Sequence, residues 1–291
     1  MREPSTTHVY FDGQITEADK ARPSLWSYSL HYGYGVFEGL RAYDHGGTAR
    51  IFRLDEHVER LYASARTLGI PLEHDRAALA EAHHEVLRAN GLTAGYIRPI
   101  VFVGDGLSGL TTRDLDVHVA ILAWSWEAGH AVPPPGVRLC VSARRRPPAD
   151  SFPPHAKATG NYVVSKLAHN EAVARGYDDA VMLDADGHVA EATALNIFAV
   201  RGDRLLTPAP HACLPGITRA AVMELAAGAG LDVREAVMDV PALTGADEVF
   251  LTSTAAGVRP VWQVEERPIG SGTTGPVTRR LAELYDDLVS R

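Results

Sequence analysis

Hydrophobic patterns divide the first half of the chain into strands and two helices. Residues 54–68 repeat apolar side chains with helical spacing, with Asp55 as the expected N-cap, and residues 75–90 predict a second helix that ends at Gly91. Short alternating or continuous apolar runs predict strands. These runs are HVYF and QIT around an Asp-Gly turn, GVFEGLRAY, ARIFRL, YIRPIVFVG and VHVAILAW.

The second half shows the same mixture of patterns. Helices are expected at about residues 162–175, where Gly176 follows, and at residues 217–229 and 277–289. The strand VRLCVSA, two hairpins in AVMLDADGHVAEAT and NIFAVRGDRLLTP, and further strand within residues 248–264 complete the set.

One segment between the halves contains a change in composition. The sequence WSWEAGHAVPPPG includes three consecutive prolines, which continue neither a helix nor a central strand. It is therefore the expected linker, at residues 124–136, between a small N-terminal domain (1–123) and a large C-terminal domain (137–291). Both domains are expected to be of the α+β class.

The composition excludes several classes of protein. Apolar residues make up 46% and charged residues 22% of the 291 residues, as in ordinary globular chains. The net charge is −8 and no block of Lys or Arg stands out, so nucleic acid and anionic membranes are not expected partners. The chain has only two cysteines, no apolar stretch long enough to span a bilayer and no signal-peptide pattern near the start. These features favour a cytoplasmic protein.

Lysine is scarce, which narrows any search for a nucleophilic amine. The three lysines are Lys20, Lys157 and Lys166. Lys157 lies among small residues in HAKATGNY, where a lysine with a lowered pKa can form a Schiff base. Lys20 and Lys166 are expected to be solvated, and a solvated side chain is the ordinary alternative for Lys157 as well.

Three further segments suggest an anionic, heteroaromatic ligand. LPGITR at residues 214–219 enters a helix and offers free N–H groups to a phosphate, unless it is only a helix cap. LTSTAAG at residues 251–257 fits a second backbone approach to an anion or an ordinary bend. Glu191 at the end of a hairpin strand is either an acid that pairs with a ring nitrogen or a surface residue.

Two other groups of residues give weaker indications of a functional site. The 13 histidines form no HExxH motif and none pairs with a cysteine at ligand spacing, so no metal site is expected. Arg144, Arg145 and Arg146 are expected to form a solvated loop, with anion binding as the alternative.

Seven of these motifs follow one another in an order that resembles a known family. They are HYGYGVFEGLRAY, HVERLYASAR, YIRP, AKATGNY, Glu191 followed by Asn-Ile-Phe, LPGITR and STAA. Between residues 9 and 285 the chain resembles the class IV, fold type IV aminotransferases, and is most similar to the branched-chain amino acid aminotransferases. The resemblance implies a two-domain α+β fold like that of D-amino-acid aminotransferase, with a small N-terminal α/β domain and a larger C-terminal α+β domain.

The resemblance also implies pyridoxal 5′-phosphate (PLP) as cofactor. Lys157 corresponds to the lysine that forms the internal aldimine, Glu191 to the acid that pairs with the pyridine nitrogen, and Tyr162 to the tyrosine near the phenolic oxygen. The phosphate-binding positions are matched by Arg60, Ile217, Thr218 and Thr254.

Substrate residues are implied in the same way. Tyr96, with the turn at Thr254–Ala255, matches the site of the α-carboxylate, and Phe37 and Trp126 match pocket walls. Arg98 and Tyr32 match the recognition of glutamate's second carboxylate. In the family, Tyr32 and the loop at residues 104–110 reach into the partner subunit's site, which implies a homodimer or a higher homo-oligomer.

The implied function is transfer of the amino group of a branched-chain or other apolar L-amino acid to 2-oxoglutarate. Lys157 would act as general base and proton carrier, and a bidentate Arg98 contact would receive the second carboxylate. The chain departs from the family at Ala192–Leu195, where a glycine-rich stretch with an acid is usual, at Ser253, and at Gly129 and His130.

Other functions on this fold remain open. A D-amino-acid or amine transaminase and an aminodeoxychorismate-type lyase are alternatives, although VFEG and YIRP favour the branched-chain branch. A non-catalytic binding module would have to retain the phosphate segments and Lys157 without using them.

Overall fold

The computed structural model describes residues 6–106, 109–112, 114–126 and 136–291. The chain divides into two compact units, one made of residues 1–130 and 156–160 and the other of residues 131–155 and 161–289. The short segment around Lys157 therefore packs within the first unit. Most of the expected linker, together with Gly129 and His130, lies outside the described residues.

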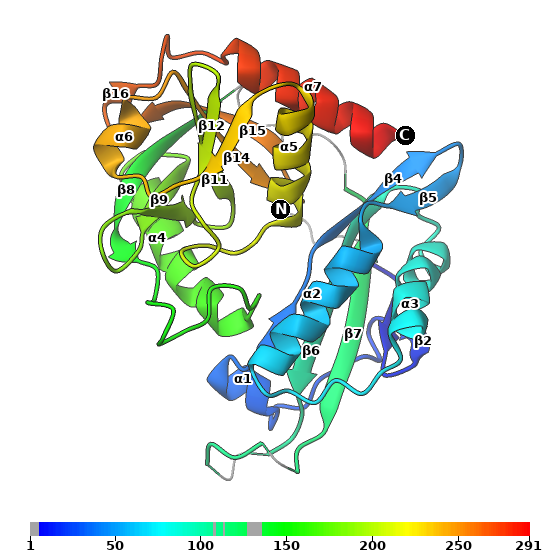
Figure 1. Cartoon of the computed structure of the whole chain (residues 1–291). Helices are drawn as coiled ribbons and strands as arrows, with labels where there is room; N and C mark the ends of the chain where they lie inside the picture. The colour runs from blue at the N-terminus through cyan, green and yellow to red at the C-terminus, as the bar shows by residue number, and fades with distance from the viewer. Residues whose placement is uncertain (1–5, 107–108, 113, 127–135) are drawn as a thin grey trace. The chain divides into compact units, whose positions relative to one another are not determined.

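The first unit contains an antiparallel sheet and three helices among its described residues (Figure 1). The strand order is β2-β1-β7-β6-β4-β5, and β3 pairs with β6. The elements are β1 (His8–Phe11), β2 (Gln14–Glu17), α1 (Tyr28–Tyr32), β3 (Gly35–Phe37), β4 (Leu40–His45), β5 (Thr48–Ile51), α2 (Leu54–Thr67), α3 (Arg76–Ala89), β6 (Gly95–Val103) and β7 (Val117–Trp124).

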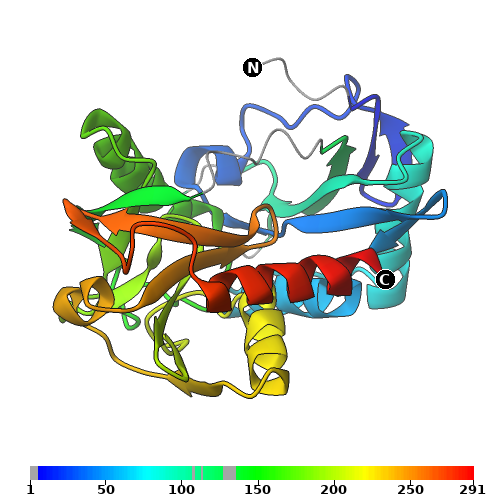
Figure 2. The same cartoon turned by 90° about the horizontal axis from the view of Figure 1, so that it is seen from above.

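Helices α2 and α3 cover one face of this sheet (Figures 1 and 2). Val58, Leu61 and Ala65 of α2 are buried against residues of β4, β6 and β7, as the helical spacing predicted. Asp75 caps α3 by accepting a hydrogen bond from the Ala78 N–H at 2.8 Å. The expected cap of α2 is wrong, because Arg53 holds the N-cap position and Asp55 lies in the first turn.

The second unit is built on a mixed sheet with the order β10-β9-β8-β15-β14-β11-β12-β13, with β16 paired to β15. Strand β8 runs parallel to β9 and to β15, and the two predicted hairpins are β9–β10 and β11–β12. The elements are β8 (Val137–Arg145), the short 3₁₀ turn η2 (Thr159–Asn161), α4 (Tyr162–Ala174), β9 (Asp179–Leu183), β10 (Val189–Ala192), β11 (Asn196–Arg201), β12 (Arg204–Thr207), α5 (Ile217–Gly228), β13 (Asp232–Glu235), α6 (Val240–Thr244), β14 (Glu248–Ser253), β15 (Gly257–Val264), β16 (Arg267–Pro268) and α7 (Pro276–Ser290).

The helices predicted in this half all form, with ends that shift by one residue or so. Helix α4 packs on β8 and β9, where Ala172 meets Cys140 and Ala180, and α5 packs on β13 and β14. Leu139, Ile197 and Leu251 belong to another apolar cluster, which includes Leu243 of α6. The short elements α1, α6, β13 and β16 were not predicted, because two to five residues give too few repeats for a periodicity to be recognised. Of the helices that the structure describes, none has both the length and the apolar character needed to cross a membrane.

Candidate functional site

Lys157 is held by backbone contacts to β3 and by helix α2. Its carbonyl accepts a hydrogen bond from the Phe37 N–H at 3.1 Å, and its own N–H donates to Ser64 Oγ at 3.0 Å. The ammonium nitrogen lies 4.7 Å from the centroid of the Phe37 ring. Lys20 is exposed beside Glu17, and Lys166 is exposed on α4. Lys157 is therefore the lysine that tertiary contacts fix in place.

Four of the expected substrate residues gather beside Lys157 in the first unit. The Arg98 guanidinium lies 4.9 Å from the Phe37 ring centroid and 5.3 Å from that of Tyr96, and its Nη2 donates to the Tyr96 hydroxyl at 3.3 Å. The Tyr96 and Trp126 rings are 5.1 Å apart. Because Tyr96 and Arg98 are two residues apart on β6, they share a face of the sheet.

Gly39 makes room for this cluster. A Cβ atom at position 39 would lie 2.0 Å from the Tyr96 hydroxyl, so only glycine fits with the tyrosine in this position. Nε of Arg98 is buried and has no hydrogen-bond partner among the described residues. An unpartnered guanidinium N–H is an available donor for an anion.

Arg60 lies in a buried group of charged and polar side chains. Its Nε and Nη2 donate to the Glu38 carboxylate at 2.6 and 2.9 Å, and His57 Nδ1 donates to the same carboxylate at 2.8 Å. Burial alone would raise the pKa of Glu38, but the Arg60 guanidinium and His57 hold it well below its usual range. Burial lowers the pKa of His57, although its hydrogen bond to Glu38 opposes that shift. The group is an anion held by a cation and a neutral imidazole.

The second unit brings Glu191 to the LPGITR segment. Glu191 is buried at the end of β10, and its Oε2 accepts a hydrogen bond from the Leu214 N–H at 3.4 Å. Asn196 Nδ2 donates to the Leu214 carbonyl at 2.8 Å. A Cβ atom at Gly216 would lie 2.0 Å from Asn196 Oδ1, so this glycine permits the close approach. The interpretation of Glu191 as a surface residue is excluded.

The expectation of a solvated arginine loop is wrong for Arg146. Arg144 and Arg145 are exposed at the end of β8, whereas the Arg146 side chain is 8% exposed and pairs with Glu191, Nε to Oε1, at 2.9 Å. The Nε–H does not point at that oxygen, so the contact is a charge pair without a hydrogen bond. The other guanidinium nitrogens donate to Ser165 Oγ and to the carbonyls of Ala192 and Thr193.

Arg146 thereby also holds the stretch in which the sequence departs from the family that it resembles. The Ala192 N–H donates to the Leu195 carbonyl at 2.8 Å, and the buried Thr193 hydroxyl donates to Asp179 at 2.6 Å. Residues 192–195 therefore form a hydrogen-bonded turn between β10 and β11 without the family's glycines.

The remaining residues expected to bind a cofactor lie at element ends in the second unit. Ile217 and Thr218 are buried in the first turn of α5, whose N-cap Gly216 supplies no capping side chain. Thr254 and Ala255 lie in the turn between β14 and β15, where Ser253 Oγ accepts a hydrogen bond from the Ala256 N–H at 3.1 Å. Tyr162 is the first residue of α4, directly after the 3₁₀ turn at residues 159–161.

Tyr32 is placed apart from the Arg98 cluster. Its ring packs on Tyr28 at 4.5 Å, and the residue is 48% exposed. The surrounding surface is unusually apolar, with Leu25, Trp26 and Leu30 each at least 65% exposed. Leu110, of the loop that the Trp26 carbonyl and the Tyr28 hydroxyl contact, is 80% exposed.

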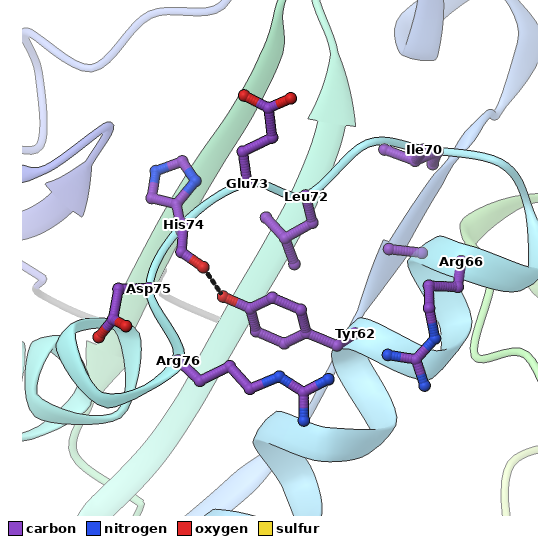
Figure 3. Close-up of a pocket in the computed structure, with 9 residues that line it drawn as sticks. Tyr62, Arg66, Ile70, Leu72, Glu73, His74, Asp75 and Arg76 are labelled. Atoms are coloured by element: carbon purple, nitrogen blue, oxygen red, sulfur yellow. Dashed lines mark hydrogen bonds between the residues drawn. The ribbon is translucent and has the colours of Figure 1, made fainter.

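The first unit also has a cavity of about 550 Å³ that contains none of the predicted site residues (Figure 3). It lies between α2 and the start of α3, where the Tyr62 hydroxyl donates to the His74 carbonyl. Arg66 and Arg76 line the cavity but both pair with Glu59. In the second unit, Asp184, Asp186 and His188 lie together because Asp184 accepts the N–H groups of the other two in the β9–β10 turn.

Sequence reasoning missed three residues that hold the predicted ones: Glu38, Ser64 and Arg146. Glu38 has a signal in the sequence, because an acid inside the apolar run GVFEGL needs a buried partner. Ser64 and Arg146 have none, since a serine on a helix and an arginine in a charged run are both ordinary surface residues.

Comparisons with known proteins find relatives over nearly the whole chain. The family model "Amino-transferase class IV" matches residues 35–264. A branched-chain-amino-acid aminotransferase of Pseudomonas aeruginosa is 40% identical over 97% of this chain and 92% of its own length. The branched-chain-amino-acid aminotransferase of Escherichia coli (strain K12) is 37% identical over 98% of this chain and 94% of its own length.

Solved structures match as well. A crystal structure of a T.th. branched-chain amino acid aminotransferase complexed with N-(5′-phosphopyridoxyl)-L-glutamate is 40% identical, with a TM-score of 0.95 over 99% of this chain and 95% of that one. A second structure of that enzyme, complexed with 4-methylvaleric acid, has a TM-score of 0.94 at the same identity and coverage. The two-domain α+β fold expected from the sequence is thus confirmed. Because the family model covers most of the chain, and both the sequence and the fold match over nearly its whole length, the chain belongs to the class IV aminotransferase family.

Proposed function

We propose that this protein is a PLP-dependent transaminase that moves the amino group of a branched-chain or other apolar L-amino acid to 2-oxoglutarate. The observation that carries the proposal is that an amine and a guanidinium both lie beside the same aromatic ring. Phe37 has the Lys157 ammonium at 4.7 Å and the Arg98 guanidinium at 4.9 Å from its centroid. A transaminase of this kind needs both an amine and a cation for the second carboxylate beside an apolar wall.

The residues present fit PLP. An ionised guanidinium at Arg60 and the N-terminus of α5, which no side chain of the described residues caps, suit a phosphate. The buried carboxylate of Glu191 suits a protonated ring nitrogen. We assign the phosphate to Arg60, Ile217, Thr218 and Thr254, the phenolic oxygen to Tyr162 and the covalent attachment to Lys157. The complexes of the T.th. enzyme support the cofactor and the apolar side chain.

When bound, PLP would supply a carbonyl carbon for the amine and a conjugated ring that takes up electron density. Lys157 would act as a general base that removes the α-proton of the substrate. It would then act as a general acid that returns this proton to the cofactor. Glu191 would keep the ring nitrogen protonated. Tyr96 and the Thr254–Ala255 turn would hold the α-carboxylate, and Phe37 and Trp126 would enclose an apolar side chain.

Dual specificity is assigned to Arg98. Its buried Nε–H and its place between two aromatic rings let it meet a carboxylate bidentately in the glutamate half of the reaction. A leucine-like side chain would lie against the same rings without needing the guanidinium. One pocket would thereby accept both kinds of substrate.

Two experiments test the proposal. Borohydride treatment of the PLP-loaded protein, followed by peptide mass mapping, should fix one cofactor on Lys157; label on Lys20 or Lys166 would contradict the assignment. Titration of a panel of L- and D-amino acids, followed by the cofactor's absorbance, should give a response to L-leucine, L-isoleucine or L-valine. A response to D-amino acids or amines alone, or an aminobenzoate product, would move the protein to the alternative reactions.

We further propose that the protein acts as a homodimer in the cytoplasm. The exposed apolar residues Leu25, Trp26, Leu30, Tyr32 and Leu110 lie on α1, on the segment before it and on the loop that both contact, and exposed apolar patches mark protein interfaces. A second copy is the proposed occupant, as expected for Tyr32 in this family. Analytical ultracentrifugation should find a dimer, and Trp26→Glu should shift it toward monomer; an unmodified protein that is monomeric at micromolar concentration would contradict the assignment.

A further inference from the structure

Glu38 is the acid of the VFEG sequence, and the proposed function gives it no task. Glu38 directly follows β3, and its side chain is fully buried, where an ionised carboxylate is unfavourable unless it is paired. It accepts hydrogen bonds from Arg60, from His57 and from the Gly39 N–H, the last at 3.2 Å. Of these partners, Arg60 is the one whose side chain has an assigned role.

We propose that Glu38, supported by His57, is a positioning residue that orients the Arg60 guanidinium for the phosphate group of the cofactor. This inference rests on the proposed function, in which Arg60 binds that phosphate. Glu38 touches neither substrate nor cofactor in this proposal. It acts through the arginine.

The geometry of the pair supports this task. A guanidinium is planar, so a carboxylate that engages both Nε and Nη2 fixes the plane and leaves the opposite edge facing one direction. His57 holds the Glu38 oxygen that Nη2 uses, so the carboxylate cannot rotate freely either. An arginine fixed beforehand loses less conformational entropy when the phosphate binds.

Helix α2 joins this group to Lys157. His57, Arg60 and Ser64 lie three and four residues apart and therefore on one face of the helix. The first two contact Glu38, and Ser64 accepts the Lys157 N–H. One rigid element thus sets the position of the phosphate-binding cation and of the attachment lysine together.

When Glu38 is neutralised, the loss of its charge and the loss of its orienting contacts predict opposite changes in the affinity for PLP. Removal of a negative charge beside Arg60 should by itself strengthen the attraction for a phosphate dianion. Loss of the bidentate acceptor should instead free the guanidinium to turn away. Glu38→Gln keeps the volume, removes the charge and places an N–H where an acceptor stood, so the sign of the change in affinity separates the two effects.

The test compares PLP with pyridoxal, which has the same ring and aldehyde but no phosphate. Apoprotein affinities for both are measured by spectral titration for the unmodified protein and for Glu38→Gln. We expect PLP to bind about tenfold or more weakly, by analogy with the loss seen when a carboxylate that orients a metal-ligating side chain is removed. Pyridoxal affinity should not change. Equal or tighter binding of PLP, or an equal loss for both ligands, would overturn the inference.

Three further variants complete the design. Arg60→Met must itself lose PLP affinity and keep pyridoxal affinity; if it does not, the phosphate assignment in the proposed function fails first. Glu59→Gln, on the same helix, removes an exposed carboxylate that pairs with Arg66 and Arg76, and should change neither affinity. If Glu38→Gln does not fold, His57→Gln carries the test: a smaller loss confined to PLP supports the inference, and no loss, or an equal loss for pyridoxal, overturns it.

Discussion

Removal of the Arg146 guanidinium should destabilise the second unit strongly. The side chain is buried, compensates the buried Glu191 carboxylate at 2.9 Å and donates to Ser165 Oγ at 2.8 Å. It also donates to the Ala192 and Thr193 carbonyls at 3.2 and 3.0 Å. Arg146→Met keeps the apolar length of the side chain and removes all of these contacts.

The expected loss of unfolding free energy is large because two kinds of group lose their partners. A buried charge left without its partner costs roughly 3–5 kcal/mol. The two carbonyls lose donors, but water that enters the vacated space can replace part of that bonding. We therefore expect Arg146→Met to lower the free energy of unfolding by about 3–5 kcal/mol, with the lone Glu191 charge as the main cause.

A double-mutant cycle isolates that cause. Urea unfolding of the apoprotein at pH 7.5, followed by circular dichroism, gives the free energies for Arg146→Met, Glu191→Gln and the double variant. The double variant should recover roughly 0.5–3 kcal/mol relative to the sum of the single changes, because no uncompensated charge is left. Arg175→Met is the matched control. It breaks a half-exposed pair with Glu265, a second pair with Glu171 and a hydrogen bond to the Val141 carbonyl, and each such exposed ion pair should contribute at most about 1 kcal/mol.

Additive effects would refute the reasoning. They would mean that the Arg146 guanidinium does not compensate the charge of the Glu191 carboxylate. The arginine would then stabilise the fold through its hydrogen bonds to the carbonyls of residues 192 and 193. A loss no larger than that of the exposed control would also contradict the buried geometry.

Four other outcomes are expected. Arg98→Ala should slow the glutamate half-reaction by an amount equivalent to roughly 2–5 kcal/mol and the leucine half-reaction far less, in single-turnover kinetics; comparable losses would assign Arg98 to the α-carboxylate. Burial lowers the pKa of His83 to about 4, so His83 stays neutral in the folded state and its full stabilising contribution is present only above about pH 6.5. As pH falls from about 6.5 toward 4 this contribution is lost at up to about 1.4 kcal/mol per pH unit, and His83→Gln should reduce that slope in urea unfolding. Burial raises the pKa of Cys213 to about 12, so neither it nor the buried Cys140 should react with Ellman's reagent at pH 8 before unfolding. Gly39→Ala should weaken turnover of both donors, because its Cβ would meet the Tyr96 hydroxyl at 2.0 Å.

The sequence by itself determined most of the elements and the order of the motifs that resemble the family. The spacing of Val58, Leu61 and Ala65 requires α2, and the Asp-Gly turns require their hairpins, because these patterns depend only on neighbours along the chain. The scarcity of lysine leaves three candidates for a nucleophilic amine, and the resemblance of AKATGNY to the family's motif favours Lys157 among them. Helices of two or fewer turns, such as α1 and α6, were missed for the same reason, since they contain too little local pattern.

Only the tertiary structure decided which polar side chains have buried partners that fix their position. Arg146 and Arg145 are neighbours of the same type in the sequence, yet one is buried against Glu191 and the other is exposed. Glu38 and Arg60 are 22 residues apart and meet because β3 and α2 pack together. Burial removes water as the alternative partner, so a long-range contact fixes the charge and orientation of each group. Local sequence patterns do not encode such contacts, because they depend on how distant elements pack.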